Sequence, residues 1–467
     1  MNRTLTTIYA VAALLLTSCG SSDVQLGGIQ GSGTGTAYGP ITGFGSIFVN
    51  GVEFTTSSAQ INIDDQPGSE SDLQVGEVVT VTGTINADGK TGTATQVTFD
   101  GDVTGRVVQI DSAGGTFIVL GQTVRVTGST MFDENIQPAS LAGLQVGTLV
   151  EVSGFATAAG EILASRVQLE PSGGTLEAKG SVQNLDTTAQ TFSLNTLVVD
   201  YSSVMPSGTL ANGAIVKVKG GGYTVSGALL ASSIEVLQGF AAASNSRGQV
   251  EGIITSFTSN TDFVLDGQHV TANANTTFTL NGVTLGADVR VEVEGSFDSS
   301  GTLVAASVEA RPDSSSMVRG LVDSIAPATN TLGVLGVTVT TDTATQVEDD
   351  SSMHLRHFKL SDLRSGDYVE VRGSAGQNGS LAAKVVVREI PASLSFLQAT
   401  ADSISFPTLT LLGITVTTTS QTQYSAADGT ALTAGAFFTQ APGKTVQVGG
   451  TVMSGSFIAS QAQIVSP

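Results

Sequence analysis

The stretch Val78-Val-Thr-Val-Thr-Gly83 (VVTVTG) contains the pattern that decides the fold of this chain. Val79 and Val81 alternate with threonine, and Gly83 takes the next position on the valine face. Successive side chains of a β-strand point to opposite faces, so the two valines share one face of a strand and the polar residues share the other. Such alternation predicts an antiparallel sheet with one face in a core and one face in water.

The Val-x-Val-x-Gly pattern recurs along the chain, with final glycines 71, 66, 75, 78 and 77 residues apart. A motif ending in alanine follows each copy, and a second glycine precedes each copy except the fourth, which has Asp288 there. A recurrence at this spacing indicates tandem domains. The copies are Val79-Val81-Gly83, Val150-Val152-Gly154, Val216-Val218-Gly220, Val291-Val293-Gly295, Val369-Val371-Gly373 and Val446-Val448-Gly450.

The residues between the valines are polar, as in Lys217 and Lys219 of the third copy, and we expect them to face water. Asn50-Gly51 in the first repeat is a strong hairpin signal. Around it, the sequence predicts strands at Ile41–Val49, Val52–Thr55, Gln60–Ile63, Val78–Ile85 and Thr93–Phe99.

Five short strands per repeat, with the longest connection between the third and fourth, predict an OB-like barrel. An immunoglobulin-like sandwich is the alternative, but it needs about seven strands in about 100 residues. The predicted fold is therefore all-β, with six tandem five-stranded OB-like barrels. The expected boundaries are 1–18 for a signal peptide, 19–37 for a Gly/Ser-rich tether, and 38–101, 102–172, 173–238, 246–311, 317–390 and 393–467 for the repeats.

The only cysteine of the chain, Cys19, ends a short apolar segment. Ile8–Leu16 is too short to span a bilayer, which takes about 20 helical residues. Leu16-Thr-Ser-Cys19 resembles the lipobox of bacterial lipoproteins, which implies lipidation of Cys19 and its exposure as the first mature residue. We therefore expect an exported protein anchored by its lipid in the bacterial envelope. Gly20 favours the outer membrane. An ordinary signal peptide with a chance cysteine is the alternative.

The charge of the chain argues against several classes of partner. Forty acidic residues face 19 lysines and arginines, for a formal net charge of −21. Nucleic-acid binding requires lysines and arginines that neutralise phosphates, so this chain is not expected to bind nucleic acid. The expected contact with the membrane runs through the lipid on Cys19, and an envelope protein or a glycan is the possible further partner.

No catalytic constellation is visible in the sequence. None of the three histidines lies near a nucleophile motif, so we predict no enzymatic activity and no cofactor. The acid pairs Asp64-Asp65 and Asp349-Asp350 fall in polar connections, where adjacent carboxylates are usually solvated.

A weak metal-site candidate comes from a predicted helix at 353–363. There His354 and His357 would share a face, with Asp350 or Asp349 as a third ligand. Two secure ligands are too few for most metal sites, so we favour a surface helix that holds no metal.

Two stretches resemble a known repeat family. These are DLQVGEVVTVTGTINADGKTGTATQV (72–97) and LRSGDYVEVRGSAGQNGSLAAKVVVRE (363–389), and GFGSIFVNGVEF (43–54) resembles the first hairpin of the same family. The chain is similar to domain of unknown function 5666, an OB-like repeat of exported bacterial proteins, over about residues 39–465. The resemblance implies a fold and an envelope setting but transfers no catalytic residue.

The sequence thus predicts a non-enzymatic, lipid-anchored envelope protein that acts as a multi-domain spacer or as a binding or adhesion module. A lipoprotein that binds a metal ion or an oligosaccharide on its barrel faces is the alternative. Six barrels of roughly 30 Å in an extended row would reach about 170 Å. The sequence leaves open whether they extend or fold back on one another.

Overall fold

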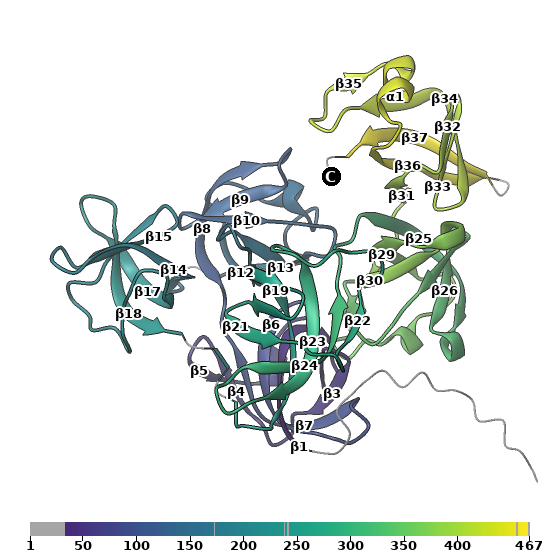
Figure 1. Ribbon diagram of the computed structural model, residues 1–467. Coiled ribbons are helices and arrows are strands. Elements are labelled where there is room, and N and C mark those ends of the chain that lie inside the picture. Colours follow the sequence, from purple (N-terminus) through teal and green to yellow (C-terminus); the bar gives the residue numbers. More distant parts are fainter. Residues whose placement is uncertain (1–32, 172, 238, 241, 454–455, 466–467) are drawn as a thin grey trace, which may run out of the picture.

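A computed structural model describes residues 33–171, 173–237, 239–240, 242–453 and 456–465. The expected signal peptide and Cys19 lie outside the described residues. The described chain is all-β, built from small five-stranded barrels in repeated domains (Figure 1). Within these ranges, no helix has both the length and the apolar character needed to cross a membrane.

The first three segments of the chain contain eighteen strands and two short 3-10 helices. Segment 1 comprises β1 (Gly33–Gly43), β2 (Ile47–Val49), β3 (Val52–Thr55), β4 (Gln60–Ile63), β5 (Gln66–Gly68), η1 (Glu70–Asp72), β6 (Val78–Ile85) and β7 (Thr91–Phe99). Segment 2 comprises β8 (Val103–Asp111), β9 (Thr116–Val119), β10 (Gln122–Arg125), β11 (Met131–Phe132), η2 (Leu141–Gly143), β12 (Leu149–Ala156) and β13 (Ile162–Leu169). Segment 3 comprises β14 (Leu176–Asp186), β15 (Thr191–Leu194), β16 (Leu197–Asp200), β17 (Ile215–Tyr223) and β18 (Leu229–Val236).

The remaining segments have the same kind of content. Segment 4 comprises β19 (Arg247–Ser259), β20 (Asp262–Leu265), β21 (Gln268–Thr271), β22 (Thr277–Thr279), β23 (Arg290–Phe297) and β24 (Leu303–Ala310). Segment 5 comprises β25 (Ser316–Ala326), η3 (Pro327–Thr329), β26 (Thr331–Val334), β27 (Val337–Thr340), β28 (Gln346–Asp349), η4 (Leu360–Asp362), β29 (Tyr368–Ala375), η5 (Gln377–Gly379) and β30 (Leu381–Glu389). Segment 6 comprises β31 (Ser395–Thr400), β32 (Ser403–Ser405), β33 (Thr408–Leu411), β34 (Ile414–Ser425), β35 (Ala431–Leu432), α1 (Ala434–Gln440), β36 (Thr445–Met453) and β37 (Ser456–Ile464).

One order of strand pairing recurs. In segment 2, β8 pairs with β9, β9 with β10, and β10 with β13; β12 then pairs with both β13 and β8 and closes the ring. Only the β10–β13 pairing in this ring is parallel. The corresponding rings are β1-β2-β3-β7-β6, β14-β15-β16-β18-β17, β19-β20-β21-β24-β23 and β25-β26-β27-β30-β29. In segment 6 the first strand is divided into β31, which pairs with β36, and β32, which pairs with β33.

The repeated valines and glycines have different structural roles in each barrel. All twelve valines have no exposed surface. Each final glycine pairs with the alanine of the following motif, as Gly295 does with Ala305, and the register of the two strands shifts beside each such pair. A Cβ atom on Gly295 would lie 2.2 Å from the carbonyl oxygen of Val304. The pattern therefore combines two core side chains with one close approach of two backbones at a β-bulge.

The segments associate in pairs through short strand contacts. Segments 2 and 3 join through antiparallel β8 and β14, and segments 5 and 6 through antiparallel β25 and β31. Segments 1 and 4, which are not neighbours in sequence, join through parallel β1 and β19. Segments 2 and 3 share one hydrophobic core, and so do segments 5 and 6.

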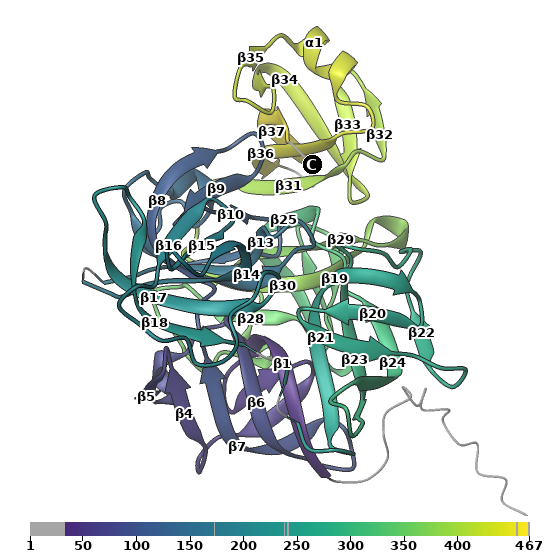
Figure 2. The same cartoon turned by 60° about the vertical axis from the view of Figure 1, so that its left-hand side comes forward.

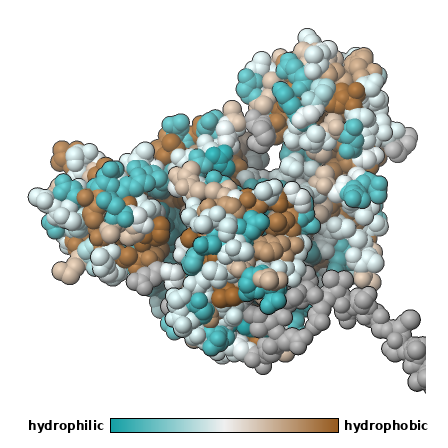
Figure 3. All heavy atoms as spheres, viewed as in Figure 1, coloured by the Kyte–Doolittle hydropathy of each residue, from teal (hydrophilic) through white to brown (hydrophobic). Residues whose placement is uncertain are grey.

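The barrels form a cluster rather than a row. Val78 of segment 1, Phe155 and Leu163 of segment 2, and Ile253 of segment 4 make one buried apolar contact. Figures 1 and 2 show the segments gathered around this region, with segment 6 at the periphery in both views. In the space-filling view of Figure 3, hydrophilic and hydrophobic residues are interspersed over the visible face. Neighbouring copies thus share apolar cores, and copies distant in sequence also meet.

Three local expectations are wrong. The first strand begins at Gly33, inside the expected tether, because residues 33–40 pair with β6; it ends at Gly43, and β2 is separate from it. The predicted helix at 353–363 is absent except for η4, and His354 has a left-handed φ of 43°. The α-helix of the described chain lies in segment 6, where the Thr433 hydroxyl accepts a hydrogen bond from the Ala436 N–H and caps α1.

Candidate functional site

A cleft of about 470 Å³ opens where segments 1, 2 and 5 meet. Segment 1 contributes residues around η1, segment 2 contributes the end of β13 and the loop after β11, and segment 5 contributes β28 and the loop that follows it. Carboxylates dominate the lining. They are Asp72, Asp133, Glu134, Glu170, Glu348, Asp349 and Asp350.

The two arginines of the cleft are occupied by contacts between segments. Arg166 of β13 donates to the Val75 carbonyl at 2.8 Å and lies 3.2 Å from Glu348. Arg356 of segment 5 donates to the carbonyls of Glu70 and Leu73 in segment 1, and its guanidinium lies 4.1 Å from the centre of the Phe44 ring. These cations hold the walls together and leave most of the carboxylates without a basic partner from the cleft.

The cleft carboxylates are electrostatically strained. Burial, together with the nearby Glu348 and Glu134, raises the pKa of Asp350 to about 8. Burial also raises the pKa of Glu348 despite its contact with Arg166, and its Oε2 atom has no hydrogen-bond partner. A carboxylate with a raised pKa is stabilised by any added positive charge. The cleft is therefore suited to a cationic ligand.

The sequence-predicted metal residues do not converge. His354 Nδ1 lies 3.1 Å from Glu134 Oε2 of segment 2, whereas His357 Nε2 lies 3.6 Å from Glu70 Oε1 of segment 1. Asp350 lines the same cleft as His354, but these three predicted residues form no shared ligand set among the described residues. The helix that would have aligned the two histidines does not form.

Asp349 explains the absence of that helix. Its carboxylate accepts hydrogen bonds from the backbone N–H groups of Ser351 and Leu355 and from the Arg388 guanidinium, at 2.5–3.1 Å. These contacts fix a turn where the helix was expected. The Asp349 side chain is fully buried, so the expectation that this acid pair is solvated is wrong for Asp349.

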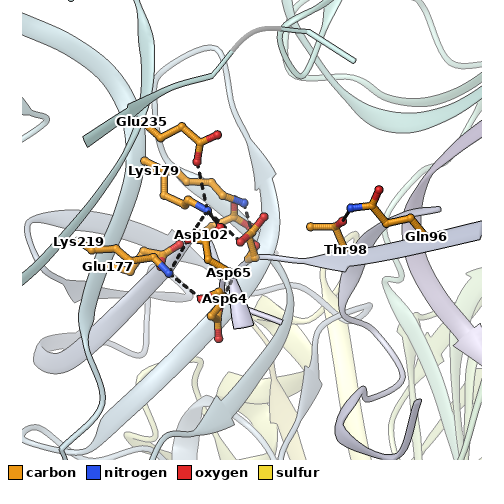
Figure 4. Close-up of polar contacts among 12 residues, drawn as sticks. Asp64, Asp65, Gln96, Thr98, Asp102, Glu177, Lys179, Lys219 and Glu235 are labelled. Atoms are coloured by element: carbon orange, nitrogen blue, oxygen red, sulfur yellow. Dashed lines mark hydrogen bonds and ion pairs between the residues drawn. The ribbon is translucent and has the colours of Figure 1, made fainter. Parts of the chain in front are cut away.

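A second charged cluster lies where segment 1 meets segment 3 (Figure 4). Lys217 Nζ on β17 lies 2.9 Å from Asp65 Oδ1 and 3.0 Å from Asp100 Oδ1. Lys219 Nζ lies 2.9 Å from Asp65 Oδ2 and 3.1 Å from Glu177 Oε2 of β14. Side-chain exposure is only 4% for Lys217 and 14% for Lys219, so the expectation that these lysines face water is wrong. The outer face of this strand contacts another barrel.

The interdomain linker takes part in the same cluster. Lys179 of β14 donates to the Asp100 carbonyl at 2.8 Å and lies 3.4 Å from Asp102 Oδ1. The Asp102 carboxylate also accepts a hydrogen bond from the Gly154 N–H at 2.7 Å. Burial raises the pKa of Glu177 to about 7. The Asp64-Asp65 pair, expected in a solvated connection, therefore lies at an interdomain contact.

These observations define an all-β class of protein, built from tandem small barrels with acidic contacts between them. The chain belongs to the family described as Domain of unknown function (DUF5666), which it matches over residues 38–98, 104–168, 251–309, 319–386 and 398–462. The match covers more than half of the chain and omits segment 3, although segment 3 has the same strand pairing. A comparison with curated proteins finds no match.

Neither the cleft nor the cluster is predicted by the sequence. Their residues come from segments whose contact depends on how the barrels pack, and no spacing in the sequence encodes that packing. One signal is present in the sequence: Lys217 and Lys219 are basic residues on either side of the core residue Val218 in a strongly acidic chain.

Proposed function

We propose that this chain is a non-enzymatic, lipid-anchored binding protein of the bacterial cell envelope, and that its acidic cleft binds a positively charged segment of an envelope partner. The observation that carries the proposal is the convergence of carboxylates from three segments on one cleft whose arginines are already engaged. Six of the seven are available to a ligand, because the Asp349 side chain is buried against Arg388. The volume of about 470 Å³ suits several side chains rather than a single small ion.

The architecture we propose is six OB-like barrels. Support comes from the recurring ring, in which the first strand pairs with the second and fourth, and the third pairs in parallel with the fifth. This is the strand order of the OB barrel. Segment 3, which lies outside the family match, is counted because its ring has the same order.

The packing of the barrels favours a binding module over a spacer. A spacer gains reach when its domains lie in an extended row. Here segments 1 and 4 pair directly although two segments separate them in sequence, so the chain is folded back and its reach is short. The cleft exists only because segments 1, 2 and 5 fold back on one another. For the envelope location, the support is Leu16-Thr-Ser-Cys19, and mass spectrometry of the native N-terminus tests whether Cys19 carries the lipid.

A fluorescein-labelled tetralysine peptide is a suitable probe of the cleft, with binding followed by fluorescence anisotropy. We expect salt-sensitive binding, and at least tenfold weaker binding after the paired substitution Glu134→Gln and Glu170→Gln, which removes two carboxylates that line the cleft. Glu53→Gln removes a carboxylate outside the cleft and serves as the control. Absence of peptide binding to the wild-type chain, or equal loss in the control, contradicts the proposed function.

A further inference from the structure

Three carboxylates in the segment 1–segment 3 cluster face one another closely. Asp64 stands in the turn between β4 and β5, Asp100 in the link between β7 and β8, and Glu177 on β14. One oxygen atom from each lies within 4.8 Å of the other two. Three parts of the chain that are far apart in sequence thus present carboxylate oxygens to one small volume.

Glu177 has an unmet hydrogen-bonding demand at this point. The residue is 3% exposed, and its Oε1 atom has no hydrogen-bond partner. Its other oxygen, Oε2, is held by Lys219 at 3.1 Å. A buried carboxylate oxygen without a partner costs free energy that a ligand at this position would recover.

Asp64 is also poorly compensated. Its carboxylate accepts one long hydrogen bond, from the Gly101 N–H at 3.3 Å, and makes no ion pair with any residue that the structure describes. Burial raises the pKa of Glu151, and the negative charge of the nearby Asp64 raises it further. The region around Asp64 is therefore strongly negative.

Acidic groups outnumber basic groups in the cluster. Three lysines, Lys179, Lys217 and Lys219, contact six acidic residues, namely Asp64, Asp65, Asp100, Asp102, Glu177 and Glu235. Lys219 contacts Asp64 at its backbone carbonyl, which leaves the Asp64 carboxylate uncompensated, whereas Lys217 Nζ pairs directly with Asp100 Oδ1 at 3.0 Å. A surplus of negative charge remains between the two barrels (Figure 4).

We propose that Asp64, Asp100 and Glu177 bind a divalent cation of the calcium type. The donor set contains only oxygen, which hard cations prefer, and water would fill the remaining positions of a six- to eight-coordinate ion. The three ligands come from segment 1, the link to segment 2, and segment 3, so the ion joins these parts. This site shares no residue with the acidic cleft, and the inference stands independently of the proposed function.

Calcium binding to the whole chain tests the inference, after removal of divalent ions by chelation. Equilibrium dialysis with radioactive calcium should find an ion with a dissociation constant of about 10⁻⁴–10⁻³ M, the range of extracellular calcium modules. Glu177→Gln and Asp64→Asn should each weaken this binding at least tenfold. Glu235→Gln is the matched control. It removes a half-exposed carboxylate whose one ion pair among the described residues is with Lys217, at 3.4 Å, and it should leave the calcium affinity unchanged within about twofold.

A second readout separates this site from calcium held elsewhere. Calcium should slow amide hydrogen exchange in β14 and β17 of the wild-type chain and of the Asp350→Asn cleft variant, but not of Glu177→Gln. Glu177→Gln keeps the side-chain shape, and Lys219 keeps its ion pair with Asp65 at 2.9 Å, so we expect the variant to fold; circular dichroism checks this. Absence of calcium binding, or binding that survives both Glu177→Gln and Asp64→Asn, overturns the inference.

Discussion

Substitution of Gly220 by alanine should loosen segment 3, whereas the same substitution at the next residue should not. Gly220 is the final glycine of the third Val-x-Val-x-Gly copy, and a Cβ atom there would lie 2.6 Å from the Leu230 carbonyl oxygen and 2.9 Å from the Leu229 side chain. A Cβ atom on Gly221 would have no heavy atom within 4 Å. The two variants therefore differ in steric contact but share strand, chemistry and change in chain entropy.

The contact distances set the size of the effect. Forcing a methyl group against backbone in a packed strand pair costs about 1–3 kcal/mol. Gly221→Ala should be neutral or slightly stabilising, by up to about 1 kcal/mol, because alanine restricts the unfolded chain. In hydrogen exchange mass spectrometry, Gly220→Ala should speed exchange of the β17 and β18 amides by about 5- to 150-fold, from the proportion of 1.4 kcal/mol per factor of ten.

Equal exchange in Gly220→Ala and Gly221→Ala would refute the assignment of the repeated glycine to a close backbone approach. Exchange of β36 and β37, which lie in segment 6, is the internal control and should be unchanged in both variants. Faster exchange throughout the chain in Gly220→Ala would instead show that segment 3 does not unfold on its own.

Three further predictions concern charge. Burial raises the pKa of Glu77, Glu177 and Glu292 to about 7 from an ordinary value of 4.5. These carboxyl groups bind protons more tightly in the folded chain than in the unfolded chain. Their contribution to the stability of the fold is therefore complete below about pH 4.5 and is lost as the pH rises through 7. The urea concentration at the unfolding midpoint should therefore decrease as the pH is raised from 5 to 8, and a constant or increasing midpoint would contradict this. Arg388→Met should destabilise segment 5 by about 3–5 kcal/mol in urea unfolding, because it leaves the fully buried Asp349 without its ion-pair partner. The double variant Arg388→Met with Asp349→Asn should regain part of the lost stability, and no recovery would count against the ion pair. Lys217→Met should weaken the contact between segments 1 and 3 by about 1–2 kcal/mol, seen as faster hydrogen exchange at residues 64–66, whereas unchanged exchange there would place the contact elsewhere.

The strand pattern could be predicted from the sequence because it depends on neighbours within one repeat. Val369 and Val371 alternate with Glu370 and Arg372, and this alone assigns the inward face of β29. Each copy has a glycine and an alanine equivalent to Gly373 and Ala383, because the bulge between their two strands requires the backbones to approach closely.

The contacts between barrels could not be predicted in the same way. The parallel pairing of Gly35–Tyr38 with residues 247–250 joins segments that are separated by two others in sequence. Local sequence also failed at residues 353–363, where a helical pattern gave way to the turn held by the buried Asp349. At residues 353–363, the contacts of Asp349 with its turn and with Arg388 thus override the local helical preference. The cleft and the charged cluster depend on such contacts, so neither follows from the repeat pattern.

The central claim is that the barrels fold back on one another and thereby build the acidic cleft. Small-angle X-ray scattering of the chain without residues 1–19 tests this most directly. A cluster of this size should have a radius of gyration between about 22 and 30 Å, from the scaling for compact chains and an allowance for its lobed outline. An extended row about 170 Å long would give about 50 Å, and a value near that would contradict the account.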